Sequence, residues 1–141
     1  MKKTLTTLFA VLPLCALAQQ NIVEQRQAAF SDIESLTKQT EKQLNQSDIN
    51  WLLVAENSDI LKTHSHQLLS LFPQGSKSGS KAKASVWNSP EKFNQLLSQM
   101  DEGFHTLYQA SLKQELSGAE SGLNIAQDTC NACHRSYRSR W

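Results

Sequence analysis

The sequence predicts an all-α fold, an antiparallel four-helix bundle. Long segments repeat their apolar residues at intervals of three and four, and no segment alternates with the period of two that marks a strand. The chain has 141 residues, of which 39% are hydrophobic and 19% charged, which suits a single domain. This length excludes a large catalytic α/β fold. The net charge of +1 is far too small for nonspecific nucleic-acid binding.

Residues 1–18 have the pattern of a secretory signal peptide. Lys2-Lys3 forms a positively charged start, and an apolar run of about 13 residues follows from Leu5 to Leu17. Ala16-Leu17-Ala18 has the small-x-small pattern of a cleavage site. We therefore expect secretion and cleavage after Ala18, which leaves residues 19–141 as the mature domain.

Two alternatives to a cleaved signal stay open. An N-terminal anchor is the first, but the apolar run is shorter than the roughly 20 residues that a spanning helix needs, so we expect no stable membrane insertion. A lipoprotein acylated at Cys15 is the second, although Leu14 is bulky where that signal has a small residue. Removal of the signal also removes Cys15, and the mature chain then keeps only Cys130 and Cys133.

The first predicted helix begins near residue 22 and fades at Asn45-Gln46. Its stripe is apolar except for one cation, Arg26, and Phe30 lies beside the stripe. A buried charge needs a partner, so Arg26 either meets one inside the protein or extends its charged end to solvent. The stripe consists of Ile22, Arg26, Ala29, Ile33, Leu36 and Thr40.

The second predicted helix follows Ser47-Asp48, which we expect to provide its N-cap, and ends near Phe72-Pro73. Residues 74–86 are rich in small and basic residues, and we interpret them as a linker. The apolar residues of this helix are Ile49, Leu52, Leu53, Ile60, Leu61, Leu68, Leu69 and Leu71.

The third predicted helix opens at Ser89-Pro90-Glu91, with serine as N-cap and proline at the first helical position. The fourth has the clearest pattern, an apolar seam with intervals of 4, 3, 4, 3, 4, 3 and 4 residues. Its start is open between two capping boxes, one at Ser111 and one at Ser117. Gly118 and Gly122 are expected to serve tight packing or to mark the helix start. The third stripe is Phe93, Leu97, Met100, Phe104 and Leu107, and the fourth seam is Leu112, Leu116, Ala119, Leu123, Ala126, Cys130, Cys133 and Tyr137.

Cys130-Asn131-Ala132-Cys133-His134 matches the attachment motif for c-type haem. Two thiols three residues apart lie on one side of a helical turn, where each can bond one haem vinyl, and the adjacent histidine then reaches the iron as the axial ligand. A simple disulfide is the alternative, but it would be strained and would leave His134 unexplained. A zinc site would need a fourth ligand, and a thioredoxin-like pair would need a preceding strand.

Four antiparallel helices bring residues near 22–33, 64–72, 87–97 and 126–138 to the same end of the bundle. The haem motif lies at this end. A haem propionate would then be one partner for the Arg26 guanidinium, and solvent exposure of its charged end is the alternative.

The chain resembles the class II cytochromes c, and within them the cytochrome c′ family, over the whole mature sequence. Most class I cytochromes carry the haem motif near the N-terminus, so its place near the C-terminus is discriminating. The resemblance implies one haem c per chain, thioether-linked to Cys130 and Cys133 with His134 as iron ligand, Arg26 near a propionate and Arg138 beside the proximal face. It rests on Arg26-Gln27-Ala28-Ala29-Phe30, Phe72-Pro73 with Gly75, Lys81-Ala82-Lys83-Ala84 leading to Trp87, Pro90, Phe93, and Cys130-x-x-Cys133-His134-x-x-Tyr137-Arg138.

The residue four positions after Arg26 decides the sixth coordination position of the iron. Low-spin relatives have methionine there, whereas this chain has Phe30, which cannot bind iron. The resemblance therefore implies five-coordinate, high-spin iron with an apolar distal pocket that admits NO and CO, with Phe30 as a steric gate. Met100, His64 and His66 are the alternative sixth ligands, and Met100 is better explained as core filler.

We therefore expect a periplasmic haem protein that carries or scavenges NO and CO, protecting against nitrosative stress, and not an enzyme. The alternatives are a low-spin, six-coordinate electron-transfer cytochrome of the same fold and a secreted helical module with a disulfide. The resemblance also implies a homodimer formed through the first two helices. A redox partner protein with acidic residues would suit the basic side chains near the haem end, although a solvated surface is the simpler explanation for them. They are Lys77, Lys81, Lys83, Arg135, Arg138 and Arg140.

Overall fold

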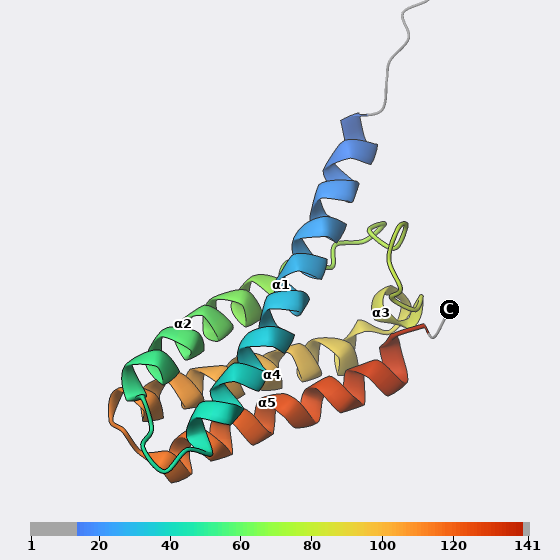
Figure 1. Ribbon diagram of the computed structural model, residues 1–141. Coiled ribbons are helices and arrows are strands. Elements are labelled where there is room, and N and C mark those ends of the chain that lie inside the picture. The colour runs from blue at the N-terminus through green and yellow to red at the C-terminus, as the bar shows by residue number, and fades with distance from the viewer. Residues whose placement is uncertain (1–13, 140–141) are drawn as a thin grey trace, which may run out of the picture.

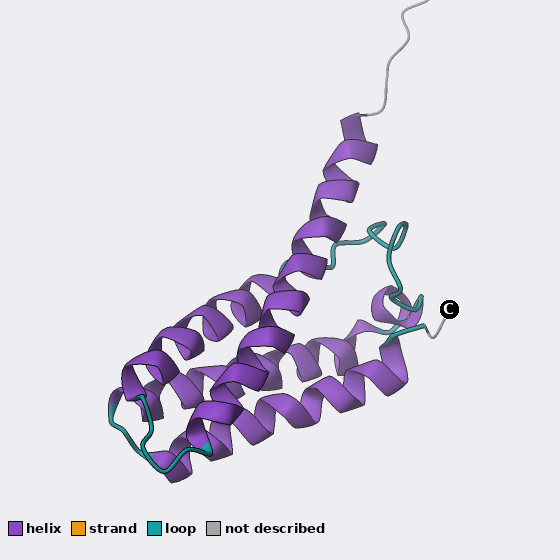
Figure 2. Cartoon of the chain, viewed as in Figure 1, coloured by secondary structure: helices purple, strands orange, loops and turns teal. Residues whose placement is uncertain are grey.

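The fold is a bundle of four long helices with one short helix added at the motif end (Figures 1 and 2). The computed structural model describes residues 14–139, and the side chains of residues 20–139. Within this range there is no β-strand, only an isolated bridge between Ala82 and Arg138. The helices are α1 (Leu14–Leu44), α2 (Trp51–Leu68), α3 (Ser85–Asn88), α4 (Pro90–Leu112) and α5 (Leu116–Tyr137).

The predicted all-α bundle is confirmed, and α3 lies at the edge of the segment interpreted as a linker. α4 packs against both α5 and α2, and α1 packs against α2 but meets α5 at few positions. The first turns of α1 extend beyond the other helices (Figure 1). In the described part of the chain, no helix is both long and apolar enough to cross a membrane. Residues 1–13 of the expected signal peptide lie outside the described residues.

The core runs along the middle of the bundle and is formed by most of the predicted stripes. Leu112 and Leu116, predicted at the start of the fourth seam, are exposed instead, because they flank the turn between α4 and α5. Three apolar residues of the second predicted helix are exposed as well: Leu52, Ile60 and Leu69. Ile33 of α1, Leu61 of α2, Phe104 of α4 and Leu123 of α5 are all buried. Burial of one such side chain contributes about 1.5–3 kcal/mol, so the stripes supply the main driving force for assembly. Met100 is buried among them, as expected for a core residue.

Two helix starts differ from the prediction. The N-cap of α2 is Asn50, whose side-chain oxygen accepts a hydrogen bond from Leu53 N at 3.1 Å, so the expected cap at Ser47-Asp48 was wrong. Asparagine directly before the helix satisfies a free N–H of the first turn, and this contact decides the boundary. Ser89 does stand at the N-cap of α4 with Pro90 at the first position, as predicted, although its side chain makes no capping bond.

The start of α5 was also predicted wrongly, because neither capping box begins this helix. Ser111 lies in the last turn of α4, where its buried hydroxyl donates to Tyr108 O at 2.7 Å. Ser117 is already inside α5. The turn between the helices is made by Gln114 in the left-handed region, with φ of 58°, and Leu112 ends α4 as an exposed residue.

Two glycines let α4 and α5 approach closely. A Cβ added to Gly122 would lie 2.7 Å from Gly103 O and closer still to Leu107 N. A Cβ added to Gly103 would lie 2.8 Å from Ala126 N. Backbone atoms cannot move aside as side-chain ends can, so these positions require glycine. The expected packing role of Gly122 is therefore confirmed, and the crossing holds α5 in place just before the cysteine motif.

Candidate haem-binding site

The cysteine motif occupies the last turns of α5. Cys130 packs partly against the core, and its thiol donates to Ala126 O at 3.5 Å. Cys133 is also half-buried, whereas His134 is exposed. Both cysteines are free thiols, and α5 continues through them to Tyr137. Residues three apart are neighbours on a helix surface, so the two thiols have the arrangement that attachment to one group needs.

The surroundings of the thiols argue against a redox-active pair or a zinc site. Burial raises the pKa of the Cys130 thiol, and it raises that of Cys133 to about 11. Redox-active cysteines act as thiolates, which such surroundings disfavour. Among the described residues, no three cysteine, histidine or acidic side chains are grouped to hold a metal ion. The two thiols therefore suit covalent attachment better than direct metal binding.

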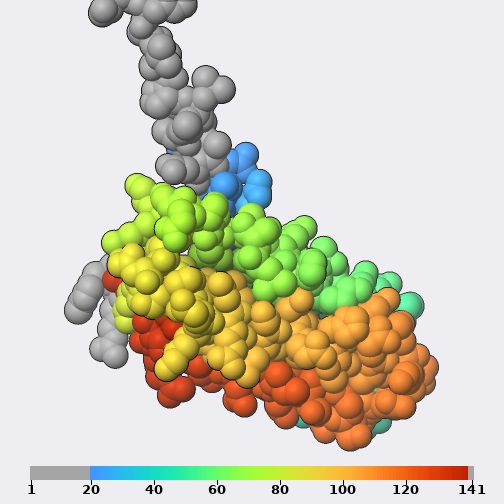
Figure 3. Space-filling view, turned by 180° about the vertical axis from the view of Figure 1, so that it is seen from behind, coloured from blue at the N-terminus to red at the C-terminus, as the bar shows by residue number. Residues whose placement is uncertain are grey.

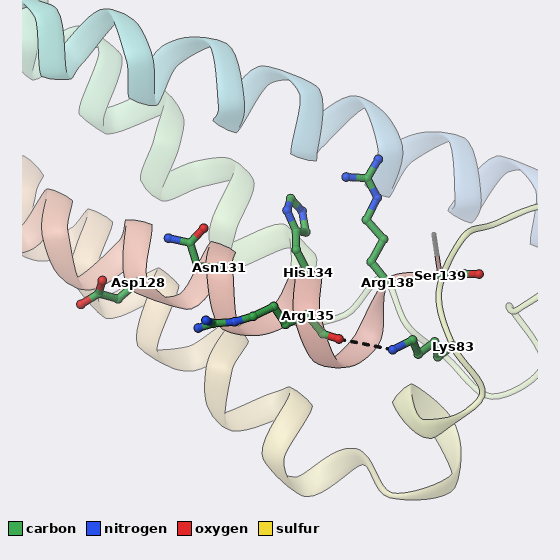
Figure 4. Close-up of a pocket in the computed structure, with 7 residues that line it drawn as sticks. All are labelled: Lys83, Asp128, Asn131, His134, Arg135, Arg138 and Ser139. Atoms are coloured by element: carbon green, nitrogen blue, oxygen red, sulfur yellow. Dashed lines mark hydrogen bonds between the residues drawn. The ribbon is translucent and has the colours of Figure 1, made fainter. Parts of the chain in front are cut away.

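An open hollow of about 800 Å³ adjoins His134 at the end of α5. Figure 4 shows His134 and Arg138 extending from α5 on the side where α1 passes. Arg138, predicted beside the proximal face, does share this hollow with His134, whereas Cys130 and Cys133 do not line it. The hollow is lined by Lys83, Asp128, Asn131, His134, Arg135, Arg138 and Ser139.

Arg26 lies inside the protein, with only 2% of its surface exposed. Its guanidinium donates to Ser76 Oγ at 2.9 Å, to Ser76 O at 2.6 Å and to Leu71 O at 3.2 Å. Burial lowers its pKa, but an arginine stays charged in proteins. The alternative in which its charged end reaches solvent was wrong, because the turn after α2 supplies its partners. Arg26 thus ties α1 to residues 71–76.

An aromatic cluster fills the interior at the motif end. The Phe72 ring lies at its centre, 4.7 Å from Phe93 and 6.4 Å from both Phe30 and Trp87. Phe93 in turn packs 5.2 Å from Tyr137 on α5. Such edge-to-face pairs add about 0.5–1.5 kcal/mol each beyond the buried area. Phe30 is the exposed end of the cluster at 37%, so an apolar wall with one accessible ring faces outward from α1.

The guanidinium of Arg26 also belongs to this aromatic cluster. It stacks 4.7 Å from the Phe72 ring centre and 5.6 Å from that of Trp87. Trp87 Nε1 donates to Pro73 O at 2.9 Å, which holds the same turn from the other side. The partners of Arg26 come from two segments of the chain, the turn at residues 71–76 and the short helix α3 with Trp87. No local pattern connects them, so the sequence indicated that Arg26 needed a partner but not which one.

Residues 81–83 form a strap over the end of α5 and are not a free linker. Lys83 N donates to Tyr137 O at 2.8 Å, and Ser139 N donates to Lys81 O at 2.7 Å. The Lys83 ammonium donates to the carbonyls of Arg135 and Ser136, at 3.3 and 3.1 Å. Figure 3 shows the yellow part of the chain packed against the red end of α5. Composition alone suggested a linker, but these bonds tie the strap to α5.

The three alternative iron ligands lie elsewhere. His64 Nε2 is 3.4 Å from Asp32 Oδ2, and His66 Nδ1 is 3.2 Å from Asp101 Oδ2. Met100 is buried in the core. None of the three lines the hollow beside His134.

Comparisons with known proteins point to one family. The cytochrome c-554 of Cereibacter sphaeroides is 31% identical over 74 residues, which cover 50% of this chain and 55% of that protein. The chain thus spans about half the length of the curated relatives it matches. The nitric oxide complex of a variant cytochrome c′ from Alcaligenes xylosoxidans superposes with a TM-score of 0.78 at 22% identity, covering 87% of this chain and 97% of that one.

A second solved structure, a cytochrome c′ with ligand-controlled dimer dissociation, has a TM-score of 0.77 at 15% identity over 86% of this chain and 97% of that one. At such identities, these structures show a shared fold. The family model for cytochrome c′ matches residues 21–138, which include most of α1, all of the later helices and the complete cysteine motif. This family implies a covalently bound haem, which the two free thiols and the neighbouring histidine fit. The chain belongs to the cytochrome c′ family.

Proposed function

We propose that this protein binds NO and CO at a five-coordinate haem c iron, as a gas carrier or scavenger and not as an enzyme. Cys130 and Cys133 would hold the haem by two thioether bonds, and His134 would be the axial ligand. When bound, the haem supplies an iron with one open coordination position. The observation that carries the proposal is Phe30, an apolar ring at the position where low-spin relatives have methionine.

The residues around Phe30 support an apolar gas site. Phe30 packs against Phe72, and Phe72 packs against Phe93. The Arg26 guanidinium, the one cation of the cluster, already donates to Ser76 and to Leu71 O. The phenylalanine rings themselves offer no hydrogen bond to water or anions but admit neutral diatomic molecules. NO and CO bind iron without a distal hydrogen-bond donor, whereas O₂ normally benefits from one. Phe30 would then be the steric gate of the site.

The two arginines have different roles in this proposal. Arg138 shares the hollow with His134 and would lie at the proximal face. Arg26 holds the turn at residues 71–76 and so keeps Phe72 behind Phe30. A contact from Arg26 to a propionate would require one of its present acceptors to be exchanged when haem is attached.

The proposed location is the periplasm. The signal-like residues 1–18 support it, because a cleavable leader of this kind directs export. Cleavage after Ala18 would shorten α1 at its N-terminal end, where its first turns extend beyond the bundle. The mature chain would then be residues 19–141.

We also propose a homodimer through α1 and α2 and a surface for an acidic redox partner. Exposed apolar side chains on α2 support the dimer, with Leu52 71% and Ile60 44% exposed. The solved relative with ligand-controlled dimer dissociation is consistent with it. Lys83, Arg135 and Arg138 line the hollow against the single acid Asp128, which suits a negatively charged partner.

One spectroscopic experiment tests the gas-binding proposal. The haem-loaded ferrous protein is measured before and after addition of NO and CO. A broad high-spin Soret band that shifts sharply with either gas is the expected result. Split α and β bands that CO leaves unchanged would overturn it and favour the low-spin electron-transfer alternative. Replacing His64, His66 and Met100 one at a time would then identify the sixth ligand.

Haem staining after denaturing electrophoresis separates both haem functions from the disulfide module. Covalently attached haem survives denaturation, so the wild-type band is expected to stain. A variant in which alanine replaces both Cys130 and Cys133 is the control and should lose the stain. An unstained wild-type band from a host that matures c-type cytochromes would contradict the proposal.

A further inference from the structure

α1 and α5 present two facing columns of side chains at the motif end. Their register is set by Gln127, whose Nε2 donates to Glu41 Oε2 at 3.3 Å. The helices run antiparallel, so each turn toward the end of α5 meets the preceding turn of α1. Helix neighbours recur every three or four residues. The α5 column therefore continues through Asn131, His134 and Arg138, and the α1 column through Lys38, Glu34 and Phe30.

This register places Glu34 opposite His134. Glu34 Oε1 accepts a hydrogen bond from Lys38 Nζ at 2.6 Å, and both side chains are well exposed, at 69% and 70%. Figure 4 shows the His134 side chain reaching from α5 toward the α1 ribbon. Glu34 also lies one helical turn after Phe30, on the same side of α1. The carboxylate is thus held on the wall that faces the cysteine motif.

Electrostatics independently support this placement. The hydrogen bond and charge of Lys38 lower the pKa of the Glu34 carboxyl, and the charges of His134 and Arg138 lower it further. The Glu34 carboxylate in turn contributes to raising the pKa of the Cys130 thiol. Glu34 on α1 therefore interacts electrostatically with Cys130 and His134 of the cysteine motif on α5, although about 100 residues of sequence separate them.

We propose that Glu34 tunes the reduction potential of the haem iron by its charge. Its carboxylate places a negative charge opposite the His134 imidazole and would favour the oxidised, more positive iron over the reduced one. Lys38 partly offsets this charge, so the pair sets the reduction potential by the balance of two opposite charges. The inference rests on the haem attachment that the proposed function assigns to Cys130, Cys133 and His134.

The test measures the reduction potential of the haem-loaded full chain and three variants. Glu34→Gln is expected to increase the equilibrium constant for haem reduction by about three- to tenfold. A tenfold increase corresponds to a reduction potential higher by about 59 mV for one electron. Lys38→Gln is expected to shift the equilibrium in the opposite direction. Glu34→Asp keeps the charge and should restore most of the wild-type potential. Both positions are exposed, so the circular dichroism spectrum of each variant should match that of the wild type.

Glu41→Gln is the matched control, because Glu41 lies on the same column two turns farther from His134. Its potential should equal that of the wild type. The proposal is overturned if Glu34→Gln behaves like this control, or if Lys38→Gln shifts the potential in the same direction as Glu34→Gln. The CO spectrum of each sample is recorded as well. Loss of gas binding with a normal Glu34 effect would contradict the proposed function alone, and a normal CO spectrum with unchanged potentials would contradict this inference alone.

Discussion

The two faces of α5 differ in how closely their neighbours approach. On one face, Gly103 and Gly122 bring the backbones of α4 and α5 into direct contact. On the other, α1 meets α5 at few positions, among them the hydrogen bond from Gln127 to Glu41. The face of α5 that contacts α4, here called the close face, fixes where the cysteine motif lies. The face toward α1, here called the open face, leaves room beside His134. One helix therefore combines a rigid support with an accessible surface.

Gly122→Ala should have the largest effect, because it breaks the close face. The added Cβ would meet backbone atoms of Gly103 and Leu107, which cannot move aside. Overpacking of this kind costs about 3 kcal/mol, and we expect a loss of that size or complete unfolding. Urea unfolding of the haem-free chain measures it. Ser121→Ala, at the exposed neighbouring position, is the control; equal stability of the two variants would show that the crossing tolerates a side chain.

Arg26→Leu should have the next largest effect, because it removes the tie between α1 and the turn after α2. Three hydrogen bonds are lost and the carbonyls of Leu71 and Ser76 lose a donor, which should cost about 2–4 kcal/mol. The midpoint of urea unfolding is the measurement. Lys42→Leu removes an exposed cation from the same helix and should change stability by less than about 0.5 kcal/mol. If Arg26→Leu destabilises the protein no more than Lys42→Leu does, the anchoring role of Arg26 is contradicted.

Phe30→Met tests the open face without disturbing the close one. A thioether at this position is expected to provide a sixth iron ligand and to weaken CO binding at least tenfold, about 1.4 kcal/mol. The ferrous spectrum should change from a broad Soret band to split α and β bands. Phe30→Leu keeps an apolar side chain and serves as the control, which should retain CO binding. Unchanged CO affinity in the methionine variant would mean that position 30 does not face the iron.

Lys83→Met should have the smallest effect, because it only loosens the strap over α5. The ammonium donates to two carbonyls of the last turn, and a cation at a helix C-terminus contributes about 0.3–1 kcal/mol. The backbone bonds of the strap remain. Thermal unfolding should show a correspondingly small decrease. Lys81→Met is the matched control, and an equal decrease there would assign the effect to general surface charge.

Much of the fold and of the site could be predicted from the sequence, because the information is local. The apolar intervals along each helix identify the buried faces, and the spacing of Cys130, Cys133 and His134 defines the attachment motif within a single turn and a half. The positions at which the helices start were predicted less well from the sequence. Ser47, Ser111 and Ser117 all had capping patterns, but Asn50 and the turn at Gln114 decided the boundaries.

The sequence by itself determined the all-helical bundle and the cysteine motif, since periodicity and motif spacing depend on neighbours within a few residues. It also showed that Arg26 was an unusual cation on an apolar stripe. Tertiary structure alone decided its partners, which lie 45 and 50 residues away. The same holds for the strap at residues 81–83 and for Glu34 opposite His134. Such contacts depend on helix register and on how closely backbones approach, and no short stretch of sequence contains either.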